Sequence, residues 1–188
     1  SYISILWPLW PTMKKKNLFT SLIICSSILL FSCQTNDTSK STVTQTTELS
    51  SVDKEIAKKE ISARIEEIIK GAKELNVEAA IKPYSIDTDF KIVNPDATVT
   101  DITTMKNAQT ESFKTLASLN FTTIKQDFIF LKKDLVMCTW TGRNEFQLKN
   151  GEKMTIAPYV GSMLFRKKDN DWKIIYAHET TASPVTIK

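Results

Sequence analysis

The apolar pattern of this chain changes from a helical period to a period of two near residue 120, and this change constrains the fold most. Between residues 55 and 119, apolar residues recur every three or four positions, as on one face of a helix. From residue 122 to 180, apolar and polar residues alternate, as in strands that bury one face. Helices followed by consecutive strands predict an α+β domain, with N-terminal helices packed on a curved antiparallel sheet.

Three helices are expected in the first half of this domain. The first contains Ile61, Ile65 and Ile68 at helical spacing, and Pro83 ends the second because proline cannot continue a helix. The expected helices cover residues 55–76, 77–82 and 103–119, and a short strand is expected at 89–94.

Four long strands are expected in the second half, joined by short turns. The dipeptide Asn150-Gly151 is typical of a two-residue hairpin loop. The expected strands cover residues 122–131, 135–148, 153–167 and 172–180. The folded domain is therefore predicted to run from residue 52 to 188.

A basic and then apolar segment precedes this domain. Three lysines at 14–16 are followed by the apolar run 18–31 and by Cys33. A helix needs about 20 apolar residues to cross a membrane, and this run is shorter. The segment resembles a bacterial lipoprotein signal, which predicts a signal peptide at 13–32 and a lipid on Cys33. Residues 1–12 are interpreted as translated or added sequence upstream of a native start at Met13.

The residues after Cys33 predict a disordered tether. Residues 33–51 are rich in Ser and Thr and contain too few apolar side chains to offset the entropy of ordering. Removal of residues 1–33 takes away three lysines and no acidic residue, and so lowers the formal charge from +4 to +1. A charge this small argues against nucleic acid as a partner.

The cysteine, histidine and glycine content predicts no metal and no cofactor. Beyond residue 33 the chain has one cysteine, Cys138, and one histidine, His178, whereas zinc normally takes three or four ligands. Cys138 lies in an apolar strand and is interpreted as packing. The four glycines form no phosphate-binding loop.

The order of elements and the closing residues 171–180 resemble the NTF2-like superfamily, with SnoaL-like and DUF4440-type domains the most similar. The last-strand pattern of those families is matched by Trp172, Lys173, Ile174, His178 and Thr180. The resemblance implies a cone-shaped barrel with a cavity between helices and sheet, commonly in a homodimer. It implies no single chemistry, because the superfamily contains enzymes, oligomerisation domains and binding modules.

Alternation along the strands, with the resemblance, predicts which residues reach that cavity. A period of two puts Trp140 with Cys138, Tyr159 with Met163, and Tyr176 with His178. These sets can line a cavity, fill the core or form a dimer interface, and alternation alone leaves the choice open. The expected lining consists of Tyr84, Asn94, Trp140, Tyr159, Met163, Tyr176 and His178.

The candidate catalytic residues favour a non-catalytic module and leave an enzyme open. In ketosteroid isomerase, an enzyme of the superfamily that this chain resembles, the base lies where the first strand ends before a proline, and here that position is Asn94. An amide is no base. His178 is the alternative base for isomerase, hydratase or cyclase chemistry, with Tyr84 or Tyr159 as donor; a hydrogen-bonded His178 in the sheet is the other interpretation.

These observations predict a lipid-anchored protein of the bacterial cell envelope. Its domain is expected to form a homodimer and to bind a small apolar ligand or a protein partner. Gln34 follows Cys33 where an acidic residue usually retains enteric lipoproteins at the inner membrane, which favours the outer membrane and leaves its face open. A purely structural or assembly role is the third hypothesis.

Overall fold

The computed structural model describes residues 49–187 of the chain. The interpreted upstream residues 1–12, the expected signal peptide 13–32, Cys33 and residues 34–48 of the expected tether lie outside the described residues. Among residues 49–187, no helix has the length and apolar character needed to span a membrane.

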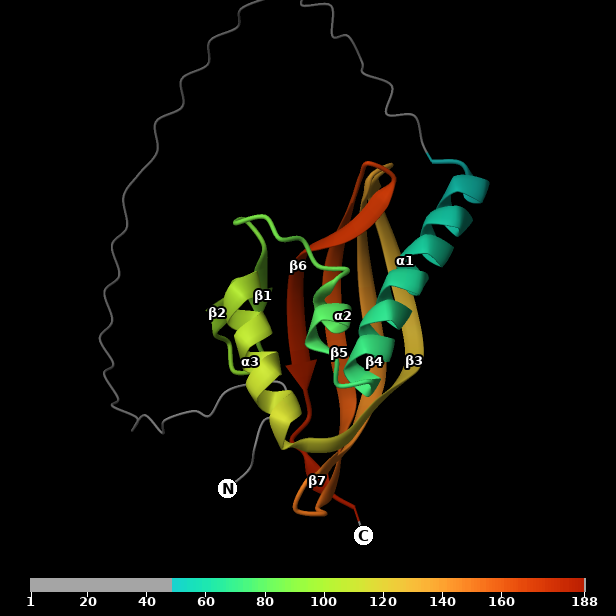
Figure 1. Cartoon of the computed structure of the whole chain (residues 1–188). Coiled ribbons are helices and arrows are strands. Elements are labelled where there is room, and N and C mark those ends of the chain that lie inside the picture. Colours follow the sequence, from blue (N-terminus) through green and yellow to red (C-terminus); the bar gives the residue numbers. More distant parts are fainter. Residues whose placement is uncertain (1–48, 188) are drawn as a thin grey trace, which may run out of the picture. The chain divides into compact units, whose positions relative to one another are not determined.

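The described elements follow the expected order of helices and then strands (Figure 1). The helices are α1 (Ser51–Lys73), α2 (Val77–Ile81) and α3 (Ile102–Thr115). The long strands are β3 (Leu116–Lys132), β4 (Leu135–Leu148), β5 (Lys153–Lys168) and β6 (Asp171–Thr181). The short strands are β1 (Lys91–Val93), β2 (Val99–Thr100) and β7 (Val185–Thr186).

Each helix begins after a polar capping residue. The side chain of that residue accepts a hydrogen bond from the backbone N–H three residues further along the chain. Ser50 accepts from Asp53 at 3.1 Å, and Asn76 caps α2 at the same distance. Asp101 caps α3 by accepting from Thr104 at 2.8 Å. These caps satisfy N–H groups that have no partner within the helix, and so they define where each helix starts.

The strands form one mixed sheet in the order β2-β1-β6-β5-β4-β3, with β7 paired to β5. The expected antiparallel pairing holds from β3 to β6, whereas β1 joins β6 in parallel, with Ile92 opposite Ala177. The sheet is curved and open, and Figure 1 shows the helices on one of its faces. The predicted α+β architecture is confirmed, with this one parallel pair as a correction.

The third helix is shorter than the sequence predicts. Residues 116–119 were expected to continue it, but the backbone becomes extended at Leu116 and the chain enters β3. Leu116 pairs with Leu148 of β4, and Leu119 pairs with Phe146 of the same strand. The side chains of Leu116 and Leu119 are both buried. Pairing with β4 outweighs the local helical period, because it buries both leucines within the sheet.

The core lies between α1 and the inner face of the sheet. Ile61 of α1 is fully buried, as are Val136, Phe165 and Ile174 of three strands. Glu60 of α1 joins the same layers by hydrogen bonds.

Glu60 accepts two hydrogen bonds from the sheet through one carboxylate oxygen. Lys167 Nζ lies 2.7 Å from its Oε2, and Trp172 Nε1 lies 2.8 Å from the same atom. The bond from Lys167, then that from Trp172, holds the pKa of Glu60 below its usual value. These two hydrogen bonds hold α1 over β5 and β6. The cavity described below lies between the helices and the sheet.

Candidate functional site

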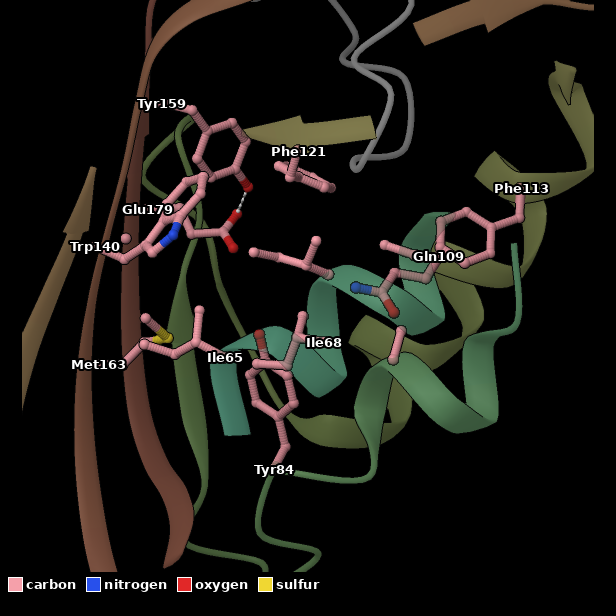
Figure 2. A pocket seen from close by; sticks show the side chains of 14 residues that line it. Ile65, Ile68, Tyr84, Gln109, Phe113, Phe121, Trp140, Tyr159, Met163 and Glu179 are labelled. Carbon is pink, nitrogen blue, oxygen red and sulfur yellow. Dashed lines mark hydrogen bonds between the residues drawn. The ribbon is translucent and has the colours of Figure 1, made fainter. Parts of the chain in front are cut away.

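A cavity of about 70 Å³ lies between the helices and the inner face of the sheet. A single water occupies about 10–15 Å³ of such a cavity, so this one holds several waters or one small molecule. Its wall is mainly apolar (Figure 2). The lining residues are Ile65, Ile68, Ile69, Ala72, Ala80, Tyr84, Gln109, Phe113, Phe121, Trp140, Tyr159, Gly161, Met163 and Glu179.

Three aromatic rings from consecutive strands form one wall. Phe121, Trp140 and Tyr159 lie with centroids 5.6–6.1 Å apart, each pair edge to face. Trp140 Nε1 donates a hydrogen bond to Thr123 Oγ1 at 2.9 Å, which fixes the indole ring. The wall is therefore rigid and apolar, and the indole N–H is already used.

A tyrosine and a glutamate form the polar part of the cavity. Tyr159 donates a hydrogen bond from its hydroxyl to Glu179 Oε2 at 2.6 Å (Figure 2). The hydroxyl of Tyr84 points into the same cavity from below. The segment that carries Tyr84 is held against β6, because Ser85 N donates to Ile174 O at 2.8 Å.

Desolvation is the main cause of the raised pKa values of these groups. Enclosure by the wall raises the pKa of Glu179, and the hydrogen bond from Tyr159 opposes that rise. Burial, and then the nearby Glu179, raise the pKa of both Tyr84 and Tyr159 well above the usual value for tyrosine. Both phenols therefore stay protonated at neutral pH and can donate hydrogen bonds.

An extra residue in β6 decides which of its side chains face the cavity. Phe165 of β5 lies opposite Ile174, whereas Leu164 lies opposite Tyr176, so that Ile175 has no partner on β5. Such a bulge reverses the alternation of side chains beyond it.

The reversal brings Glu179 inward and turns His178 outward. Glu179 lies opposite Gly161, and both line the cavity. His178 lies opposite Ser162, and its side chain is exposed. The expectation that His178 and Tyr176 face the cavity is wrong, because a strict period of two takes no account of the bulge. His178 therefore lies outside the site in which it was expected to act as a base.

The structure brings together four of the expected lining residues. Tyr84, Trp140, Tyr159 and Met163 all line the cavity.

Asn94 is buried but lies outside the cavity lining. It closes the turn after β1, where its Nδ2 donates to Thr98 Oγ1 at 2.8 Å. Its amide therefore has a structural role at the sheet edge.

Sequence reasoning missed Glu179 and Gln109. Gln109 of α3 directs its amide nitrogen toward the cavity (Figure 2). A polar residue within an amphipathic helix gives no local sign of this position. Glu179 follows the bulge, which the sequence does not reveal.

The remaining reactive groups form no further centre. Within residues 49–187, no three His, Cys, Asp or Glu side chains gather as a metal site. Cys138 is fully buried, and burial raises the pKa of its thiol to about 12. The thiol therefore stays protonated and packs as an apolar side chain.

Comparison with known proteins identifies the fold. Neither a protein-family model nor a curated protein sequence matches the chain. A putative scytalone dehydratase from Novosphingobium aromaticivorans DSM 12444 superposes with a TM-score of 0.67 at 8% identity, covering 74% of this chain and 93% of that one. The fold is NTF2-like.

Two further solved structures support this NTF2-like fold. The hexachlorocyclohexane dehydrochlorinase LinA-type3 from Novosphingobium barchaimii LL02 has a TM-score of 0.63 at 10% identity, covering 73% and 94% of the two chains. A putative dehydratase from the NTF2-like family from Streptomyces avermitilis has a TM-score of 0.59 at 11% identity, covering 68% and 97%. The predicted resemblance to NTF2-like and SnoaL-like domains is confirmed as a likeness of fold.

Replacing Glu179 by Gln should remove a pH-dependent loss of stability. Because the pKa of Glu179 is raised in the folded chain, its contribution is complete below the unfolded pKa and is lost as pH rises through the folded pKa. Across that window, the free energy of unfolding should fall more in the wild type than in Glu179→Gln. Urea unfolding at several pH values measures this difference.

The control is Glu66→Gln, which alters an exposed glutamate of α1. This variant should keep the wild-type pH dependence. The same pH dependence in the wild type and in Glu179→Gln would show that Glu179 is well solvated.

Proposed function

We propose that this protein binds a small, mainly apolar molecule in the cavity between its helices and its sheet. The observation that carries the proposal is a mainly apolar wall that surrounds a few polar groups, chief among them the hydrogen-bonded pair of Tyr159 and Glu179. Ligand sites commonly combine an apolar lining with a few polar groups that fix orientation. The rigid aromatic wall supplies contact area at little entropic cost.

The solved neighbours are consistent with a small-molecule site. One is named a hexachlorocyclohexane dehydrochlorinase and others are named putative dehydratases. Only their fold is shared at these identities, so the chemistry proposed for this chain depends on the residues of its own cavity.

An acid–base enzyme is the second candidate, and the environment of Glu179 favours it. A desolvated carboxyl beside two protonated phenols can exchange a proton with a bound molecule. In this candidate the proton-transfer group is Glu179 rather than His178. Loss of turnover in Glu179→Gln, with binding of benzyl alcohol retained, would distinguish the enzyme from the binding module.

The cellular location is a separate proposal, based on the expected signal peptide at residues 13–32. A lipid on Cys33 would hold the domain at the bacterial envelope, at the outer membrane in our proposal, with residues 34–50 as the link to α1. The homodimer also stays a prediction. Ile124, Ile129 and Leu131 on the edge strand β3 expose apolar surface that a second copy can cover.

Filling the cavity from the sheet should abolish binding of small apolar compounds. A Cβ at Gly161 would meet nothing nearer than Met163 Cε at 4.0 Å, so Gly161→Val should fold and occupy the cavity. We expect wild type to bind toluene or benzyl alcohol, and Gly161→Val to bind at least tenfold more weakly. Ligand-observed NMR with the full chain in detergent measures the affinities.

The matched control is Ser162→Val, which places the same side chain one residue away on the other face of β5. It should bind as the wild type does, and circular dichroism should show both variants folded. If no single-ring or short-chain compound binds the wild type, or if Gly161→Val binds equally well, the cavity is not a ligand site.

Lipid attachment should depend on Cys33 alone. In a bacterial host, the chain should incorporate radiolabelled palmitate, and Cys33→Ala should abolish the label because its thiol is the expected attachment point. Cys25→Ala is the control and should retain the label, since Cys25 lies in the segment expected to be removed. Equal labelling of Cys33→Ala and the wild type would refute the anchor.

A further inference from the structure

The cavity carries one acidic group and no basic partner for it. Among its described lining residues, Glu179 is the acidic side chain, and no Lys, Arg or His is present. The phenols of Tyr84 and Tyr159 are the other titratable groups in the lining. By contrast, Glu60 outside the cavity is paired with Lys167 at 2.7 Å. A carboxylate in an apolar enclosure is costly unless a proton or a cation neutralises it.

One oxygen of Glu179 is free to meet a ligand. Tyr159 donates to Oε2, while the other carboxyl oxygen points toward the open part of the cavity (Figure 2). The hydroxyl of Tyr84 faces the same space and can accept as well as donate. A ligand group that donates several hydrogen bonds fits this arrangement.

The aromatic wall adds a second attraction for positive charge. The rings of Phe121, Trp140 and Tyr159 pack together beside Glu179, and the indole N–H of Trp140 is already bonded to Thr123. Aromatic faces attract ammonium groups, most strongly where water is excluded. An anionic ligand would instead add a second negative charge within the same enclosure.

We infer that the ligand of this cavity is a small apolar amine, whose ammonium group pairs with Glu179 and lies among the aromatic rings. This inference rests on the proposed function, because it specifies the polar group of the molecule that the cavity binds. In the competing arrangement, Glu179 is protonated and its O–H donates a hydrogen bond to an oxygen of a neutral ligand. The two arrangements differ in the charge of the ligand, and this difference makes them separable.

Three probes with the same ring test the inference. Benzylamine, benzyl alcohol and benzoate differ in the charge of one substituent. Calorimetry with the full chain in detergent at pH 7 should give a benzylamine affinity at least tenfold above that of benzyl alcohol. Benzoate should bind more weakly than both.

Substitution of the carboxyl should erase this preference. In Glu179→Gln, benzylamine affinity should fall at least tenfold, while benzyl alcohol affinity should change less than threefold, because the amide keeps the shape of the side chain. Glu66→Gln, on the exposed face of α1, should behave as the wild type. Retained binding of benzyl alcohol shows that Glu179→Gln is folded.

Each other outcome is decisive. Benzyl alcohol binding as tightly as benzylamine, or an amine preference that survives in Glu179→Gln, overturns the inference and leaves the proposed function standing. Failure of all three probes to bind the wild type overturns both. The two failures are therefore distinguishable.

Discussion

The single buried face of the sheet controls which side chains reach the cavity. Each strand presents alternate residues to the helices, and α1 covers that face with Ile61 and Ile65. The extra residue Ile175 reverses the alternation of side chains in the rest of β6. As a result, Glu179 faces the cavity and His178 does not. One local irregularity thus determines the acid–base character of the site.

Much of the fold follows from patterns that are local in the sequence. Strand β4 has the expected bounds, because residues 135–148 alternate without interruption. The inward positions of Trp140, Tyr159 and Met163 follow from the same alternation, since the pairing of β4 with β5 is regular over these residues. The end of α3 was not predictable in this way, because Leu116 enters the sheet through a partner strand far along the chain.

The candidate site was harder to predict, because its polar residues depend on tertiary structure. Nothing in the composition of residues 171–181 marks a bulge, so the pattern points to His178 and hides Glu179. Gln109 reaches the cavity only because α3 packs against α2 and β1. Asn94 was expected to line the cavity, but its amide instead donates a hydrogen bond within the turn after β1.

Thiol labelling at positions 178 and 179 tests most directly whether β6 turns Glu179 into the cavity. His178→Cys and Glu179→Cys would be compared in a chain with Cys25 and Cys33 replaced by Ser, where the buried Cys138 should not react. We predict fast labelling of His178→Cys, and slow labelling of Glu179→Cys that slows further with a bound cavity ligand. Fast labelling of Glu179→Cys together with protection of His178→Cys would contradict this account of the site.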